Sequence, residues 1–142
     1  MGGRVLGVDV GQRRVGLAIS DASRTLARPL RTLDVTDPAN AVERVMKTID
    51  TLLTDEDGLD TIVIGLPAQL DGSATGATPR VQAFIDALRA KTTLRIVTED
   101  ERLTSREAES RLAINERDWR KRKRKLDAAA AAIILQDYLD RR

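Results

Sequence analysis

The first 35 residues carry patterns typical of β-strands. Residues 4–10 form a short apolar run rich in β-branched side chains, which predicts a buried strand. In residues 15–20 large and small side chains alternate, which predicts a second strand. The gap between the two is of hairpin length and contains a glycine, so the pair should be antiparallel. Residues 25–35 predict a third strand, and Pro29 places it at a sheet edge because proline cannot donate a ladder hydrogen bond.

From residue 37 onward, helical and strand patterns alternate. Apolar side chains at helical spacing predict a helix from the Asp-Pro pair at 37–38 to about residue 53. Further along, the sequence predicts two strands, 61–65 and 94–98, and helices over about 78–91, 104–115 and 126–139. The helix at 104–115 begins with a capping box. This order favours an α/β fold with a mixed five-stranded sheet. Three antiparallel strands come first and alternating α/β units follow, so helices should cover both faces of the sheet. At 142 residues, 42% of them apolar, we expect one domain spanning 1–142.

Composition narrows the possible chemistry. The chain has no cysteine and no histidine, which excludes disulfides, thiol catalysis, cysteine-bound zinc and a Ser/His/Asp triad. Hydrolysis would then depend on carboxylates, Lys, Ser/Thr or a metal held by oxygen atoms. No apolar run approaches 18 residues and no export signal pattern is present, so we expect a cytoplasmic protein that does not enter a membrane.

Charge is concentrated in one segment. The net charge is only +2, but residues 117–125 contain seven basic residues and one acid and carry +6, which leaves −4 for the rest. Such a block repels itself, so we expect a loop or arm, mobile from about 115 to 124 and ordered by nucleic acid. It also holds the only tryptophan, Trp119, which could stack on a base. A purely structural basic run is the alternative.

Three acidic positions are candidates for catalysis. Asp9 ends an apolar strand between two valines, where a lone charge is costly to bury unless a cation compensates it. Asp127 is expected in the first turn of the last helix, on the inward stripe of Ala131, Ile134 and Tyr138. A third ligand could come from the acids at 99–101, which follow a strand. Since ligands bind at strand ends in α/β sheets, these acids could share a crevice.

Each candidate has a simpler explanation. Asp9 could hydrogen-bond to the turn that follows it, Asp127 could interact with the helix dipole, and residues 99–101 could form a solvated turn. The glycine-rich loop at 65–76 could contact phosphates through backbone N–H groups, or it could merely connect two elements.

Four separated blocks resemble the YqgF family, also called RuvX, whose members are described as Holliday junction resolvases or pre-16S rRNA nucleases. The blocks are Gly-Val-Asp-Val-Gly at 7–11 with 13–21, residues 63–67 with 71–73, Asp-Glu-Arg-Leu-Thr-Ser at 100–105, and Asp127 with 131–139. The resemblance implies a ribonuclease-H-like fold and a carboxylate triad, Asp9, Glu101 and Asp127, that binds Mg²⁺ or Mn²⁺. The choice of Glu101 over Asp100 or Glu99 rests on the family pattern.

The function we expect is two-metal phosphodiester hydrolysis that processes the 5′ end of precursor 16S rRNA in ribosome biogenesis. The expected nucleic-acid contacts are Arg13, Arg14, Arg102, Arg117, Trp119, Arg120, Lys121, Arg122, Lys123, Arg124 and Lys125. The alternatives are a Holliday junction resolvase and an RNA-binding ribosome assembly factor without turnover. An actin-like ATPase would need two such domains. The sequence offers no clear dimer seam, so we expect a monomer or weak dimer, which favours RNA over a junction that needs two sites.

Overall fold

The computed structural model describes residues 3–66, 79–100 and 119–141, with the backbone alone at 100 and 119–126. The strands are β1 (Arg4–Val10), β2 (Arg14–Ser20), β3 (Ala27–Asp34), β4 (Leu59–Leu66) and β5 (Arg95–Asp100), and the helices are α1 (Pro38–Thr54), α2 (Pro79–Arg89) and α4 (Trp119–Arg141). No helix in these ranges is long and apolar enough to cross a membrane. The expected loop at 65–76 beyond Leu66 and the helix at 104–115 lie outside the described residues.

The five strands form one mixed sheet in the order β3-β2-β1-β4-β5. β1, β2 and β3 pair antiparallel, whereas β4 and β5 join β1 through parallel ladders. This confirms the expected mixed sheet. β3 lies at the edge, as Pro29 predicts, and the β2–β3 register shifts beside the Ala18–Pro29 pair.

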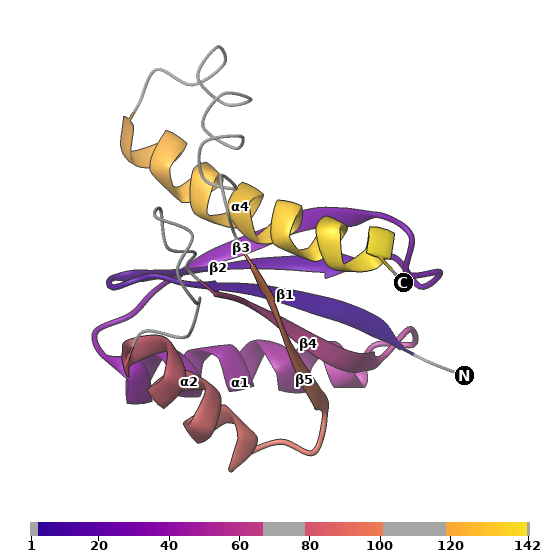
Figure 1. Cartoon of the computed structure of the whole chain (residues 1–142), viewed down its shortest axis with the longest axis horizontal. Coiled ribbons are helices and arrows are strands. Elements are labelled where there is room, and N and C mark those ends of the chain that lie inside the picture. The colour runs from indigo at the N-terminus through magenta and orange to yellow at the C-terminus, as the bar shows by residue number, and fades with distance from the viewer. Residues whose placement is uncertain (1–2, 67–78, 101–118, 142) are drawn as a thin grey trace.

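Helices cover both faces of the sheet (Figure 1). α1 and α2 pack on one face, where alternate residues of β1 such as Leu6 and Val8 are fully buried with them. The Asp37 side chain caps α1 by accepting a hydrogen bond from the Asn40 N–H at 2.8 Å, and Pro38 stands at the first helical turn. α4 covers the opposite face and buries Val5 of β1 together with Val63 of β4.

α4 approaches the sheet over glycines. A Cβ atom on Gly16 of β2 would lie 2.0 Å from the carbonyl oxygen of Asp127, and one on Gly7 of β1 would lie 2.8 Å from the Cβ of Leu135. The helix backbone therefore occupies the space that a side chain at residue 16 would need. This close approach fixes where α4 crosses β1 and β2.

The basic segment differs from the expectation. α4 begins at Trp119, not near residue 126, so residues 119–124 are helical and the expected loop is wrong for them, whereas ordering of this segment by nucleic acid stays a prediction. Lysine and arginine are good helix formers and extend the alanine-rich helix toward its N-terminus. Asp127 is consequently the ninth residue of α4, beyond its first turn, and the helix-dipole explanation no longer applies.

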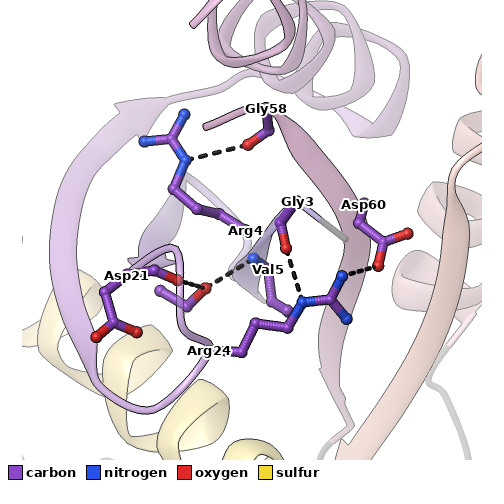
Figure 2. A network of polar contacts seen from close by, with 8 residues as sticks. Gly3, Arg4, Val5, Asp21, Arg24, Gly58 and Asp60 are labelled. Carbon is purple, nitrogen blue, oxygen red and sulfur yellow. Dashed lines mark hydrogen bonds and ion pairs between the residues drawn. The ribbon is translucent and has the colours of Figure 1, made fainter. Parts of the chain in front are cut away.

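The end of the sheet where β1 begins is closed by polar contacts (Figure 2). Arg24, at a left-handed φ of 60°, donates from Nε to the Gly3 carbonyl oxygen at 2.7 Å and forms an ion pair with Asp60. Arg4 donates from Nε to the Gly58 carbonyl oxygen at 3.0 Å. These arginines bind the chain to itself, so they are structural rather than available to a ligand.

The turn after β2 belongs to the same end. Asp21 accepts hydrogen bonds from the backbone N–H groups of Thr25 and Leu26. These hydrogen bonds lower the pKa of the Asp21 carboxyl below its ordinary value of 3.8, and the bond from the Thr25 N–H has the largest effect. The carboxylate thus serves as a turn acceptor.

The glycine contact predicts a graded cost of added methyl groups. Gly16→Ala should destabilise the protein by about 1–3 kcal/mol and lower its Tm by about 3–9 °C, because the methyl meets helix backbone that cannot move alone. Gly7→Ala is the comparison and should cost less, because its closest contacts, the Leu135 Cβ at 2.8 Å and the Ala131 carbonyl oxygen at 3.0 Å, are longer than the 2.0 Å contact at Gly16. Thermal unfolding by circular dichroism checks this, and equal Tm values for the wild type and Gly16→Ala would contradict it.

Candidate metal and nucleic-acid site

Asp9 lies near the carboxyl end of β1 on the face that α4 covers. Side chains alternate along a strand, and Val5 faces α4 whereas Val8 faces α1, which places Asp9 on the α4 side. Its partner in the antiparallel ladder is Gly16, and Asp9 itself is partly buried. Because Gly16 has no side chain, the backbone of α4 at Asp127 and Ala128 comes close to the sheet beside this carboxylate.

Asp127 reaches the same glycine from the helix. Its carbonyl oxygen lies over Gly16, and its side chain is 27% exposed. The structure therefore brings Asp9 and Asp127 to either side of one glycine, although 118 residues separate them in the chain. The inward stripe that sequence predicts for Asp127 is present, since Ala131 and Ile134 are fully buried.

Arg14 forms an ion pair with Asp127. Its Nε donates to Oδ2 at 2.8 Å, and the Arg14 side chain is 25% exposed. The sequence suggests Arg14 only as a phosphate contact. It gives no signal for the ion pair with Asp127, because that pair links the start of β2 to a residue 113 positions away. In this structure the guanidinium contributes the positive charge that a lone carboxylate here would need.

A hollow of about 420 Å³ opens beside this ion pair. Its lining comes from the β1–β2 turn and from α4: Gly11, Gln12, Arg13, Arg14 and Asp127. The turn is tight, because the Gly11 N–H donates to the Arg14 carbonyl oxygen at 2.9 Å and a Cβ on Gly11 would lie 2.6 Å from that oxygen. Arg13 is exposed at the rim, where the sequence predicts a phosphate contact.

A second hollow of about 210 Å³ includes the same turn residues, Gly11 and Gln12. It continues to the start of α1 and to Arg80 at the start of α2. Arg80 is exposed, and the sequence analysis did not single it out. No local pattern marks it, since only the tertiary structure brings α2 next to the turn.

Glu99 pairs with the C-terminal end of α4. It is 6% exposed, and its Oε2 lies 2.7 Å from Nη2 of Arg141, which is about 21 Å along the helix from Asp127. The solvated-turn explanation is therefore wrong for Glu99. Asp100 ends β5 opposite Leu66, and the side chain of Asp100 lies outside the described residues, as does Glu101.

The described side chains supply part of a metal site. Among them, no group of three or more His, Cys, Asp or Glu residues is placed to hold a metal ion. Asp9 and Asp127 both offer hard oxygen donors, which Mg²⁺ and Mn²⁺ prefer, and Asp127 lines the 420 Å³ hollow. The two carboxylates fit part of the coordination shell of a divalent cation, and a further carboxylate would be needed to complete it. Of the basic candidates, Arg102 and Arg117 lie outside the described residues, and the side chains from Trp119 to Lys125 are not described.

The Arg14–Asp127 pair predicts a measurable coupling. In a double-mutant cycle with Arg14→Gln, Asp127→Asn and the combined variant, the coupling free energy should be about 0.5–1 kcal/mol without metal, because both groups are only partly exposed. Urea unfolding of the four proteins measures it. Strictly additive effects would show that the ion pair does not form in solution.

The sequence matches a known family over nearly its whole length. The family model RuvX, described as Holliday junction resolvase, matches residues 3–141. A relative from Chloroflexus aggregans is 42% identical over 138 residues, covering 97% of this chain and 94% of its own, and one from Desulforudis audaxviator is 36% identical over 139 residues, covering 98% and 95%. Both relatives bear the name "Putative pre-16S rRNA nuclease".

Solved structures support the fold. The chain superimposes on Thermus thermophilus RuvC with a TM-score of 0.53 and 14% identity, covering 96% of this chain and 93% of that one. Fowlpox virus resolvase, solved with Holliday junction DNA, gives a TM-score of 0.55 and 13% identity, covering 97% of each. At such identities the likeness is one of fold, and that fold is ribonuclease-H-like. With the family match and relatives across almost all of its residues, this chain belongs to the RuvX family.

Proposed function

We propose that this protein is a divalent-metal-dependent nuclease that hydrolyses phosphodiester bonds in precursor 16S rRNA. The observation that carries the proposal is that Asp9 on β1 and Asp127 on α4 both lie next to Gly16, and that Asp127 lines a hollow with Arg13 and Arg14. Family membership and the names of the relatives supply the substrate class.

The carboxylates and the arginines would bind different groups, the metal and the substrate. Asp9 and Asp127, with Glu101 as the third carboxylate, would hold Mg²⁺ or Mn²⁺. When bound, such ions supply an activated water and stabilise the leaving oxygen. Arg13 at the rim of the hollow binds the phosphate backbone and orients it. This scheme needs no histidine, and the chain has none.

The N-terminal part of α4 extends the binding surface. Six of its first seven residues, 119–125, are basic, and they lead along the helix to Asp127. A basic helical segment that leads to Asp127 attracts a polyanion and gives affinity without choice of sequence. We infer that the substrate backbone lies along this part of α4 and enters the hollow at the β1–β2 turn.

A single-site enzyme fits RNA trimming better than junction resolution. Symmetric cleavage of a four-way junction needs two active sites at a fixed spacing in a stable dimer. Among the described residues, the exposed large hydrophobic side chains are Leu26, in the turn before β3, and Leu53 on α1, which gives no apolar patch for such a dimer. The Fowlpox virus and Thermus thermophilus structures share the fold but do not decide the substrate.

Removal of the Asp9 carboxylate should abolish catalysis but not folding. With Mn²⁺ present, cleavage of a 5′-extended 16S rRNA fragment should fall by more than about 100-fold in Asp9→Asn, since changes even to groups that only support a metal ligand cost 10- to 100-fold. Asp50→Asn, at an exposed carboxylate on α1, is the matched control and should cleave normally. The assay follows labelled RNA on a gel, with the Tm of each variant measured in parallel.

A four-way DNA junction and light scattering complete that experiment. A monomer that cuts the RNA and leaves the junction intact supports the proposal. A stable dimer that makes paired symmetric nicks in the junction and spares the RNA would overturn it in favour of a resolvase. RNA binding without cleavage at any Mn²⁺ concentration would instead support an assembly factor without turnover.

The basic part of α4 should set the salt dependence of binding. Replacing Arg120, Lys121, Arg122 and Lys123 with alanine should weaken binding of all sequences and reduce the slope of log K against log salt by about 0.7–0.9 for each phosphate that the variant no longer neutralises. Alanine keeps the helix, so the weaker binding reports charge rather than unfolding. Fluorescence anisotropy at several salt concentrations measures the slope, and an unchanged slope would place the RNA elsewhere.

A further inference from the structure

Arg14 lies where two kinds of cation would compete. Its guanidinium contacts Oδ2 of Asp127, the carboxylate that the proposed function assigns to a divalent ion. The contact is made by Nε, and the two Nη groups of Arg14 make no hydrogen bond within the described part of the chain. The side chain therefore neutralises Asp127 with one donor and keeps its other donors available for a second anion.

The surroundings of Arg14 allow its side chain to move away from Asp127. The Arg14 backbone is fixed in the β1–β2 turn, where its carbonyl oxygen accepts from Gly11 N–H at 2.9 Å. The side chain, in contrast, borders the 420 Å³ hollow and is 25% exposed, like its partner at 27%. A single-donor contact at this exposure is weaker than a buried bidentate pair, so a divalent ion can displace it.

We propose that Arg14 is an exchangeable internal cation. It holds Asp127 in the metal-free protein, gives up the carboxylate when a divalent ion binds, and then turns into the hollow to contact a phosphate of the substrate. This inference rests on the proposed function, because it takes Asp127 as a metal ligand. It makes metal binding and nucleic-acid binding mutually favourable, since each removes the competitor of the other.

Metal binding without nucleic acid gives the first test. Arg14→Gln should bind Mn²⁺ roughly three- to tenfold more tightly than wild type in isothermal titration calorimetry, because the competing cation is gone. Arg44→Gln is the control: Arg44 is exposed on α1, away from the hollow, and its removal changes the net charge equally, so its effect should stay within about twofold.

RNA binding in EDTA gives a second test in which neither metal nor cleavage takes part. Asp127→Asn mimics the neutralised carboxylate and releases Arg14, so it should tighten binding of a single-stranded RNA by roughly three- to tenfold. In an Arg14→Gln background the same change should tighten binding by less than about twofold. A merely structural arginine would not produce this dependence of one substitution on the other.

The outcomes separate this proposal from the proposed function. If wild type binds Mn²⁺ and Arg14→Gln binds it equally or more weakly, Arg14 does not compete for Asp127, and this proposal alone is overturned. Equal tightening of RNA by Asp127→Asn in both backgrounds overturns it as well. If wild type binds no Mn²⁺ at all, the metal site itself fails, and both proposals fall with it.

Discussion

The backbone-to-backbone approach of α4 to β2 at Gly16 sets the position of the helix over the sheet, and with it the position of the carboxylates that we propose as metal ligands. A side chain at that position would collide with the Asp127 carbonyl oxygen, so the helix can take its place only because the strand presents a glycine. The same glycine is the ladder partner of Asp9. One close contact therefore sets the helix crossing and brings residues 9 and 127, which are far apart in the chain, to the same glycine. Packing and function depend here on a single missing side chain.

The negative charge of the carboxylates near Gly16 is compensated in part by a positive group of the protein itself. Two carboxylates on one side of a sheet repel each other unless a cation is near. Arg14 supplies that cation from the turn that follows β1, and the partly exposed pair it forms with Asp127 holds the helix to the hairpin. Six basic residues also stand at positions 120–125 in the N-terminal part of α4, which leads to Asp127. The site thus has an internal counter-charge and a surface suited to a polyanion.

The two ends of the sheet have different roles. Where β1 begins, Arg4 and Arg24 bind carbonyl oxygens and carboxylates of the chain, and the Asp21 turn uses its carboxylate as a backbone acceptor. Where β1 ends, two hollows share the turn at Gly11 and Gln12, and Arg13 remains exposed. This agrees with the general tendency of α/β sheets to bind ligands beyond the carboxyl ends of their strands. Arginines occur at both ends, so arginine content alone does not locate the site.

Local patterns determined much of this protein. Alternation and apolar runs located all five strands to within a few residues, Pro29 identified the edge strand, and the Asp37-Pro38 pair marked the start of α1, because these features act through the backbone of their own segment. Asp9 also stood out locally, as a charge in an apolar strand. The start of α4 was misplaced, since charge repulsion in residues 117–125 argued for a loop whereas helix propensity and continuity with the alanine-rich run extended the helix to Trp119. Only the tertiary structure decided that Arg14 pairs with Asp127, that Glu99 is held by Arg141 and that Arg80 lies near the turn. These contacts join residues far apart in the chain, and they exist only because α4 and α2 settle on opposite faces of a twisted sheet, a geometry that no local sequence pattern encodes.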